Sequence, residues 1–142
     1  MKVVVTVDGF DVLRRKLKTL EDAAAVDTLE KAVLAGAKII QEDASRRAPK
    51  RTGKLSRSIE IEVRDKTRNA VSVDVGPRRE AFYGKFVEMG HALVRGRRKA
   101  EKRIIGYVSP KPFLRPAFDS NITAVRRTIA NALKAALGRV AR

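Results

Sequence analysis

The stretch "DTLEKAVLAGAKIIQEDASRRAPKRTGKLSRSI" (residues 27–59) decides the fold. Its first two thirds place apolar side chains at helical spacing, at Leu29, Val33, Ala37, Ile40 and Ala44. Such a periodicity is typical of a helix with one face on a core. Pro49 cannot continue a helix and pushes the preceding residue out of the helical region. The stretch therefore predicts a long central helix that starts at residue 27 or 28 and ends near residue 47.

The second part, "APKRTGKLSRSI" (residues 48–59), is basic and irregular. Gly53 allows a backbone turn that other residues resist. Thr52 and Ser56 can bond local backbone groups. Leu55 and Ile59 are apolar and are expected to anchor the segment in the core. We interpret it as a structured connection from helix to strand, with its basic side chains turned outward.

Alternating apolar residues on both sides of this stretch predict strands. Residues 59–64 and 71–75 alternate with a period of two and are joined by a polar connection, which is typical of an antiparallel hairpin. Residues 3–7 predict a further strand, and Asp8 is expected to cap a helix that ends near Leu20.

The second half adds a short helical turn, a basic excursion and a last helix. Residues 82–90 hold three of the seven aromatic residues, and we expect them to pack on the sheet. Residues 91–111 are polar and basic, and residues 104–108 could supply another strand. The last helix carries an apolar stripe at Phe118, Ile122, Val125, Ile129, Ala132 and Ala136. The predicted fold class is α+β, with an antiparallel sheet of three to five strands against the central and C-terminal helices.

The composition restricts the classes of function. The chain has 142 residues, which suits one domain over residues 1–142, with residues 93–103 as a basic loop or arm that we expect to be mobile. It has no cysteine, which excludes disulfides and thiolate metal sites. No stretch reaches the ~18 apolar residues that span a bilayer. The N-terminus turns acidic at Asp8, unlike a signal peptide.

The charge is strongly positive and unevenly distributed. Lys and Arg number 32 against 16 Asp and Glu, which gives a formal charge of +16. Residues 46–111 hold 19 basic and seven acidic side chains. Two clusters dominate. They are Arg46, Arg47, Lys50, Arg51, Lys54 and Arg57, followed by Arg95, Arg97, Arg98, Lys99, Lys102 and Arg103.

These clusters have two interpretations. They can be solvated loops, and the two arginines at residues 46 and 47 also suit the negative end of a helix dipole. Alternatively they contact phosphates or a partner protein, with salt-dependent and sequence-independent affinity for DNA. Few aromatic residues are interleaved with the charges, which disfavours base stacking and favours backbone contacts.

Catalytic chemistry finds little support in the sequence. His91 is the only histidine, so a site with two histidine ligands cannot be built in one chain. No glycine-rich phosphate loop occurs. Glu88 lies in an otherwise apolar stretch, and we expect it to form a structural ion pair with an arginine. A small basic ribonuclease that uses His91 or Glu88 remains an alternative.

Three blocks of sequence now stand out in order. The first is residues 48–59, the second is residues 83–90, and the third is "PFLRPA" (residues 112–117), which opens the last helix. Together they resemble a family of tailed-phage morphogenesis proteins, the head–tail joining, neck or minor tail components of the gene-product-ten type. The resemblance rests on Pro49, Thr52, Gly53, Leu55, Tyr83, Phe86, Glu88, Gly90, Pro112, Phe113 and Pro116.

The resemblance implies a virion structural protein at the head–tail junction, made in the host cytoplasm. It implies a homo-oligomeric ring through which genomic DNA passes, with neighbouring connector and tail proteins as partners. It implies no enzymatic activity, no cofactor, no metal and no membrane contact. A general nucleic-acid-binding module from another context is the alternative from a different class of function.

Overall fold

The structure is a computed structural model that describes residues 2–7, 22–67, 70–96 and 101–140. Its elements follow in chain order: β1 (Val3–Val7), α2 (Asp22–Arg47), α3 (Lys54–Arg57), β2 (Ile59–Lys66), β3 (Val71–Pro77), the 3-10 turn η1 (Arg79–Ala81), α4 (Gly84–Met89), β4 (His91–Arg95), β5 (Arg103–Val108) and α5 (Leu114–Val140). The α+β fold class is confirmed.

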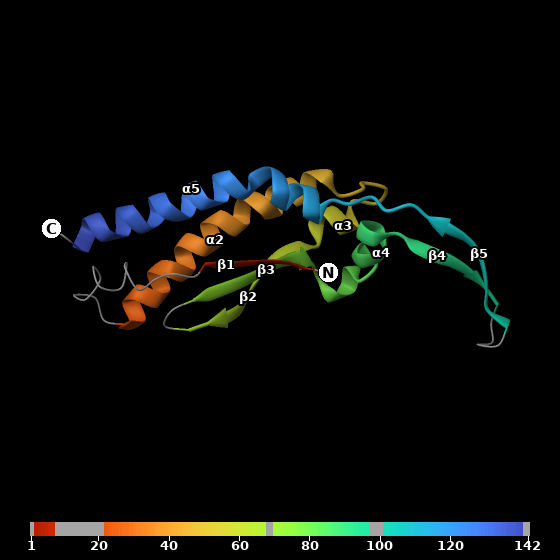
Figure 1. Cartoon of the computed structure of the whole chain (residues 1–142), viewed down its shortest axis with the longest axis horizontal. Coiled ribbons are helices and arrows are strands. Elements are labelled where there is room, and N and C mark those ends of the chain that lie inside the picture. Colours follow the sequence, from red (N-terminus) through yellow and green to blue (C-terminus); the bar gives the residue numbers. More distant parts are fainter. Residues whose placement is uncertain (1, 8–21, 68–69, 97–100, 141–142) are drawn as a thin grey trace.

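The body of the molecule has three layers (Figure 1). β1, β3 and β2 form an antiparallel sheet in that order, so that β3 lies in the centre. The inward side chains of β3, Val71, Val73 and Val75, are completely buried. α2 covers this face of the sheet, and α5 packs along α2. The hydrophobic core therefore lies between the sheet and the two long helices.

The two long helices approach closely at Gly36 of α2. A Cβ atom at this position would lie 3.0 Å from side-chain carbons of both Val125 and Ile129 of α5. These two residues belong to the apolar stripe that the sequence predicts, and both are buried. A larger residue at position 36 would push α5 away from α2, because core packing leaves little room for added atoms.

β4 and β5 form a separate two-stranded antiparallel sheet. We call it the arm. It extends away from the body, as Figure 1 shows at the end opposite the C-terminus. The strand predicted at residues 104–108 is confirmed as β5, but β4 is not predicted. Its sequence contains a histidine and an arginine, so apolar and polar residues do not alternate clearly. It forms a strand because it pairs with β5.

Three other expectations need comment. The predicted helix from Asp8 to Leu20 lies outside the described residues. The central helix starts at Asp22, earlier than predicted, because the alanines of residues 23–25 favour a helix and continue it. The expectation that residues 82–90 pack on the sheet holds in part: Tyr83 and Val87 pack against the core, whereas Phe82 is 70% exposed and Phe86 45% exposed.

Candidate functional site

The segment of residues 48–59 connects α2 to β2 as expected, but it contains the short helix α3, which the sequence analysis does not predict. Gly53 has a φ of 69°, in the left-handed region that favours glycine, and precedes the short helix α3. Leu55 and Ile59 are buried in the core. The Ser56 hydroxyl donates to the carbonyl of Ser45 at 2.7 Å, which ties the segment to the end of α2. Its basic side chains at positions 50, 51, 54 and 57 are exposed.

Glu88 caps α5 from a different element. It is only 5% exposed, and its carboxylate accepts hydrogen bonds from the backbone N–H groups of Phe113 (2.7 Å), Leu114 (3.0 Å) and Arg115 (3.0 Å). The first N–H groups of a helix have no partner within the helix, and its dipole favours a negative charge there. The expected ion pair with an arginine is therefore wrong, because the helix end supplies the partners.

This cap joins the second and third blocks of the sequence. The backbone N–H of Lys111 also donates to the carbonyl of Val87 at 2.8 Å. Gly90 follows α4 with φ 71° and ψ 171°, a conformation that is nearly restricted to glycine. A Cβ atom there would lie 2.6 Å from the carbonyl oxygen of Val108. Block two therefore fixes both the start of α5 and the base of the arm.

Asp43 forms a second buried polar contact, between α2 and α5. Its carboxylate accepts hydrogen bonds from Arg46 (3.0 Å), Arg47 (2.9 Å) and the side-chain amide of Asn121 (2.7 Å). Burial favours the neutral acid, but the hydrogen bonds from Arg47 and Asn121 outweigh it and lower the pKa of Asp43 below its usual value of 3.8. Two cations of the first basic cluster are thus already paired within the chain.

This arrangement predicts a pH-dependent contribution to stability. Because the pKa of Asp43 is lower in the folded chain, its contribution is complete above the unfolded pKa and is lost as the pH falls through the folded pKa. We expect Asp43→Asn to lower the free energy of unfolding by about 2 kcal/mol at neutral pH, the range for hydrogen bonds to charged groups. Urea unfolding from pH 7 down to pH 2 measures this difference, which should shrink below about pH 4.

Asp65→Asn is the matched control, since Asp65 is exposed and has no ion pair among the described residues. It should change stability little at any pH. An Asp43→Asn difference that stays constant down to pH 2 would contradict the charge-based account.

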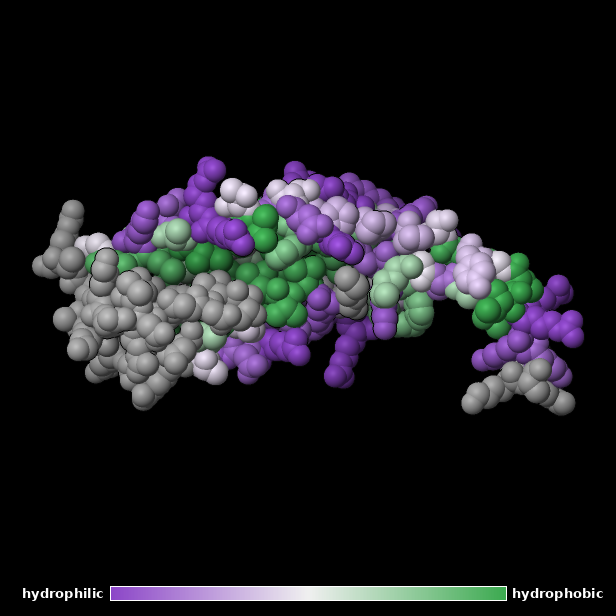
Figure 2. Space-filling model, viewed as in Figure 1, coloured by the Kyte–Doolittle hydropathy of each residue, from purple (hydrophilic) through white to green (hydrophobic). Residues whose placement is uncertain are grey.

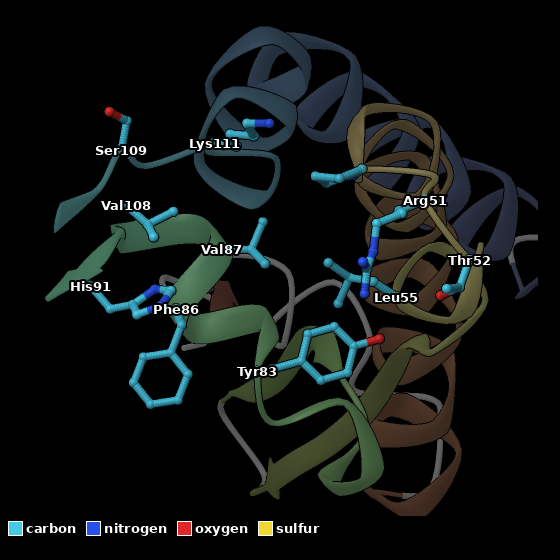
Figure 3. A pocket seen from close by; sticks show the side chains of 11 residues that line it. Arg51, Thr52, Leu55, Tyr83, Phe86, Val87, His91, Val108, Ser109 and Lys111 are labelled. Atoms are coloured by element: carbon cyan, nitrogen blue, oxygen red, sulfur yellow. The ribbon is translucent and has the colours of Figure 1, made fainter. Parts of the chain in front are cut away.

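A pocket of about 380 Å³ lies where the first two blocks meet the base of the arm (Figure 3). Apolar side chains form most of its lining. They are Pro49, Leu55, Tyr83, Phe86, Val87 and Val108. Arg51 and Lys111 lie at its border, and His91 packs edge-on against Phe86 with ring centroids 5.5 Å apart. A mostly apolar lining with a few polar groups at its edge suits an apolar side chain.

The arm presents apolar side chains on both faces. On one face, Ala92 pairs with Tyr107 and Val94 pairs with Ile104 across the strands. Val94, Ile104 and Tyr107 are 50%, 58% and 76% exposed. The opposite face carries the pairs His91 with Val108 and Arg95 with Arg103, and Leu93 lies between them. An isolated two-stranded hairpin is marginally stable in water. Burial of its exposed apolar side chains against another chain would stabilise the arm.

The remaining predicted cations fall into three groups. Lys50, Lys54, Arg57 and Lys102 are exposed, and the Arg57 guanidinium donates to the carbonyl of Thr52 at 3.2 Å. Arg95 and Arg103 lie opposite each other on the arm. Arg97, Arg98 and Lys99 lie outside the described residues. Whether any of these residues contacts DNA or a partner stays a prediction.

The sequence analysis misses a third basic surface on α5. Its exposed side carries cations without a carboxylate partner in the described part of the chain, at Arg126, Arg127, Lys134 and Arg139. The signal is present in the sequence, because these residues lie off the apolar stripe of the last helix. Apart from the adjacent pair Arg126 and Arg127, these residues are separated along the sequence by other residues. They therefore do not form a continuous basic run such as the two clusters predicted above.

Two observations on the described residues concern the chemistry that the sequence analysis considers. No group of three histidine, aspartate or glutamate residues in the described ranges could hold a metal ion. Both oxygens of Glu88 are taken up by backbone N–H groups of α5. A helix long and apolar enough to span a membrane is likewise not found among the described residues.

Comparison with known protein families identifies a match over the first two blocks. A model of the family described as "Bacteriophage HK97-gp10, putative tail-component" matches residues 11–90, which cover more than half of the chain. Comparisons with curated proteins and with solved structures find no match. The chain therefore belongs to the HK97-gp10-like family of phage tail components.

Proposed function

We propose that the chain is a head–tail connector, neck or tail-completion subunit that assembles into a ring through which genomic DNA passes. The family places it among phage tail components. The finer assignment, to a ring at the junction between head and tail, rests on its surface. In this proposal the protein is made in the host cytoplasm and becomes part of the virion. Its role there is structural, without catalysis or cofactor.

The arm is the observation that carries this proposal. It projects from the body (Figure 1) and exposes apolar side chains on both faces. Figure 2 shows hydrophobic residues of the arm from one side, next to hydrophilic residues toward its tip. Such a surface is costly in water and is typical of an interface. A contact between the arm of one copy and a different surface of the next copy would be head-to-tail, and repetition of such a contact can close a ring.

The positive charge supports passage of DNA. A ring repeats each cationic surface around its axis, so a modest basic patch becomes a strong positive collar. The exposed cations of residues 50–57 and of α5 are candidates for this collar. Contact with phosphates gives affinity without sequence preference.

We expect the basic side chains of residues 50–54 to contribute measurably to DNA affinity. The triple variant Lys50→Gln, Arg51→Gln and Lys54→Gln should bind duplex DNA at least about tenfold more weakly at low salt. The slope of log affinity against log salt should fall by about one for each phosphate that the variant no longer binds. Fluorescence anisotropy at several salt concentrations measures both quantities.

The matched control removes the same charge elsewhere. Lys31→Gln, Lys38→Gln and Lys85→Gln replace three exposed lysines on α2 and α4. If both triple variants bind DNA equally weakly, net charge alone explains binding and no DNA-facing surface exists at residues 50–54. If neither triple variant changes in affinity or in assembly, the segment has no such role.

The second candidate function is a sequence-independent nucleic-acid-binding module that acts without assembly. The exposed cations of α5 favour it, since they need no ring to contact a duplex. It predicts that the isolated subunit binds DNA tightly with a steep salt dependence and forms no closed particle.

A further inference from the structure

The pocket at the base of the arm combines an apolar interior with a cationic border. Its volume is about 380 Å³, and most of the side chains that line it are apolar. Figure 3 shows Val87, Leu55 and Tyr83 around this space, with Arg51 and Lys111 from two other segments. Within the described residues, neither of these two cations has a carboxylate partner.

The pocket continues onto one face of the arm. His91 and Val108 line the pocket and are partners across the two strands. Leu93 follows on the same face, opposite Gly106, which has no side chain, and is 42% exposed. The apolar surface of the pocket therefore extends outward along this face.

The outer end of this face carries a pair of like charges. Arg95 and Arg103 are direct partners in the two strands, and both are exposed. Like charges directly opposite each other destabilise a strand pair. An anionic group between them would relieve the repulsion. The face thus presents two cations at the pocket, an apolar strip, and two more cations beyond it.

We propose that this face binds an extended acidic segment of another protein of the particle. An apolar side chain of that segment fills the pocket, and its carboxylates meet Arg51 and Lys111 at one end and Arg95 and Arg103 at the other. At about 3.3 Å per residue, about eight to ten extended residues cover the pocket and the five residues of β4. This inference rests on the proposed function. It adds to that function the kind of protein segment that binds one face of the arm.

The chemistry favours a protein over the two other occupants. DNA would use the four cations but would leave the apolar pocket and strip between them unfilled. In the proposed ring, a second copy of this chain contacts the opposite face of the arm, which carries Val94, Ile104 and Tyr107, so this face is left for another protein. An acidic segment with an apolar anchor satisfies both the charges and the pocket, and pockets for single side chains are what give such contacts specificity.

The probe is a fluorescein-labelled peptide with two glutamates at each end and alternating threonine with leucine or phenylalanine between them. A second peptide has serine in place of each leucine and phenylalanine. Anisotropy titrations against the full chain should give at least about tenfold tighter binding of the apolar peptide, because only this peptide fills the pocket. A short DNA duplex serves as the third ligand.

Two site variants and two matched controls complete the experiment. Ser109→Trp adds bulk at the pocket, and Thr123→Trp adds the same bulk on exposed α5. Arg51→Gln with Lys111→Gln removes two charges at the pocket, and Arg126→Gln with Arg127→Gln removes two elsewhere. Each site variant should weaken binding of the apolar peptide at least about tenfold, and each control less than about threefold.

Equal affinity for the two peptides, equal effects of site and control variants, or binding of the duplex without the peptides would overturn the proposal. Electron microscopy of the same preparations reports ring formation independently. Rings without specific peptide binding would refute the acidic partner segment alone, whereas peptide binding without rings would refute the ring.

Discussion

Glu88→Ala is expected to lower the free energy of unfolding by about 4 kcal/mol, which corresponds to about a thousandfold change in the unfolding equilibrium. The substitution removes the acceptor of three backbone N–H groups at the start of α5, of which two are buried and one is partly buried. Each unsatisfied buried donor costs about 1–3 kcal/mol. The first turn of α5 also loses the negative charge that its dipole favours.

Equilibrium unfolding in urea measures this effect. Glu88→Gln is the conservative variant, because it keeps the shape and one accepting oxygen, and it should cost about 2 kcal/mol. The matched control is Glu80→Gln, which changes an exposed glutamate in η1. If Glu88→Gln and Glu80→Gln have equal stability, the cap does not hold α5, and the account of the second and third blocks is wrong.

Removal of the apolar side chains from the face of the arm that carries Val94, Ile104 and Tyr107 is expected to abolish ring assembly. Val94→Thr, Ile104→Thr and Tyr107→Thr keep residues that favour strands but remove three exposed large apolar side chains. At about 1.5 kcal/mol for each side chain buried at an interface, the triple variant weakens each subunit contact by more than about 4 kcal/mol. Self-association should weaken about a thousandfold, as measured by sedimentation velocity over a wide range of concentration.

The stability of the subunit itself should change little, because these side chains lie in solvent in the free chain. Val4→Thr with Val63→Thr is the control, since both valines are exposed on the main sheet, away from the arm. Unchanged association of the arm variant, or an equally large effect of the control, would show that the arm is not the assembly contact.

The sequence predicts the elements whose pattern is local. Leu29, Val33 and Ile40 define the buried face of α2, and Val71, Val73 and Val75 define the centre of the sheet, because burial on one face imposes a period that the chain itself displays. The connection at residues 48–59 is also predicted from the sequence, because proline ends the helix and glycine marks the turn.

What the sequence does not predict depends on partners far along the chain. Glu88 lies 25 residues before Phe113, and nothing in the local pattern indicates that its carboxylate meets a helix end and not an arginine. Arg46 and Arg47 pair with Asp43 at spacings of three and four residues within α2, but the contact of Asp43 with Asn121 of α5 depends on the fold. β4 becomes a strand through its pairing with β5, and the pocket exists only where the first two blocks meet the arm.

Negative-stain electron microscopy of the full chain, purified with nuclease and high salt and imaged at several concentrations, tests the central claim most directly. The account predicts closed rings with a central hole wide enough for duplex DNA, and the arm variant should form none. Small particles at every concentration, also after addition of duplex DNA, would contradict the ring and favour the free nucleic-acid-binding module.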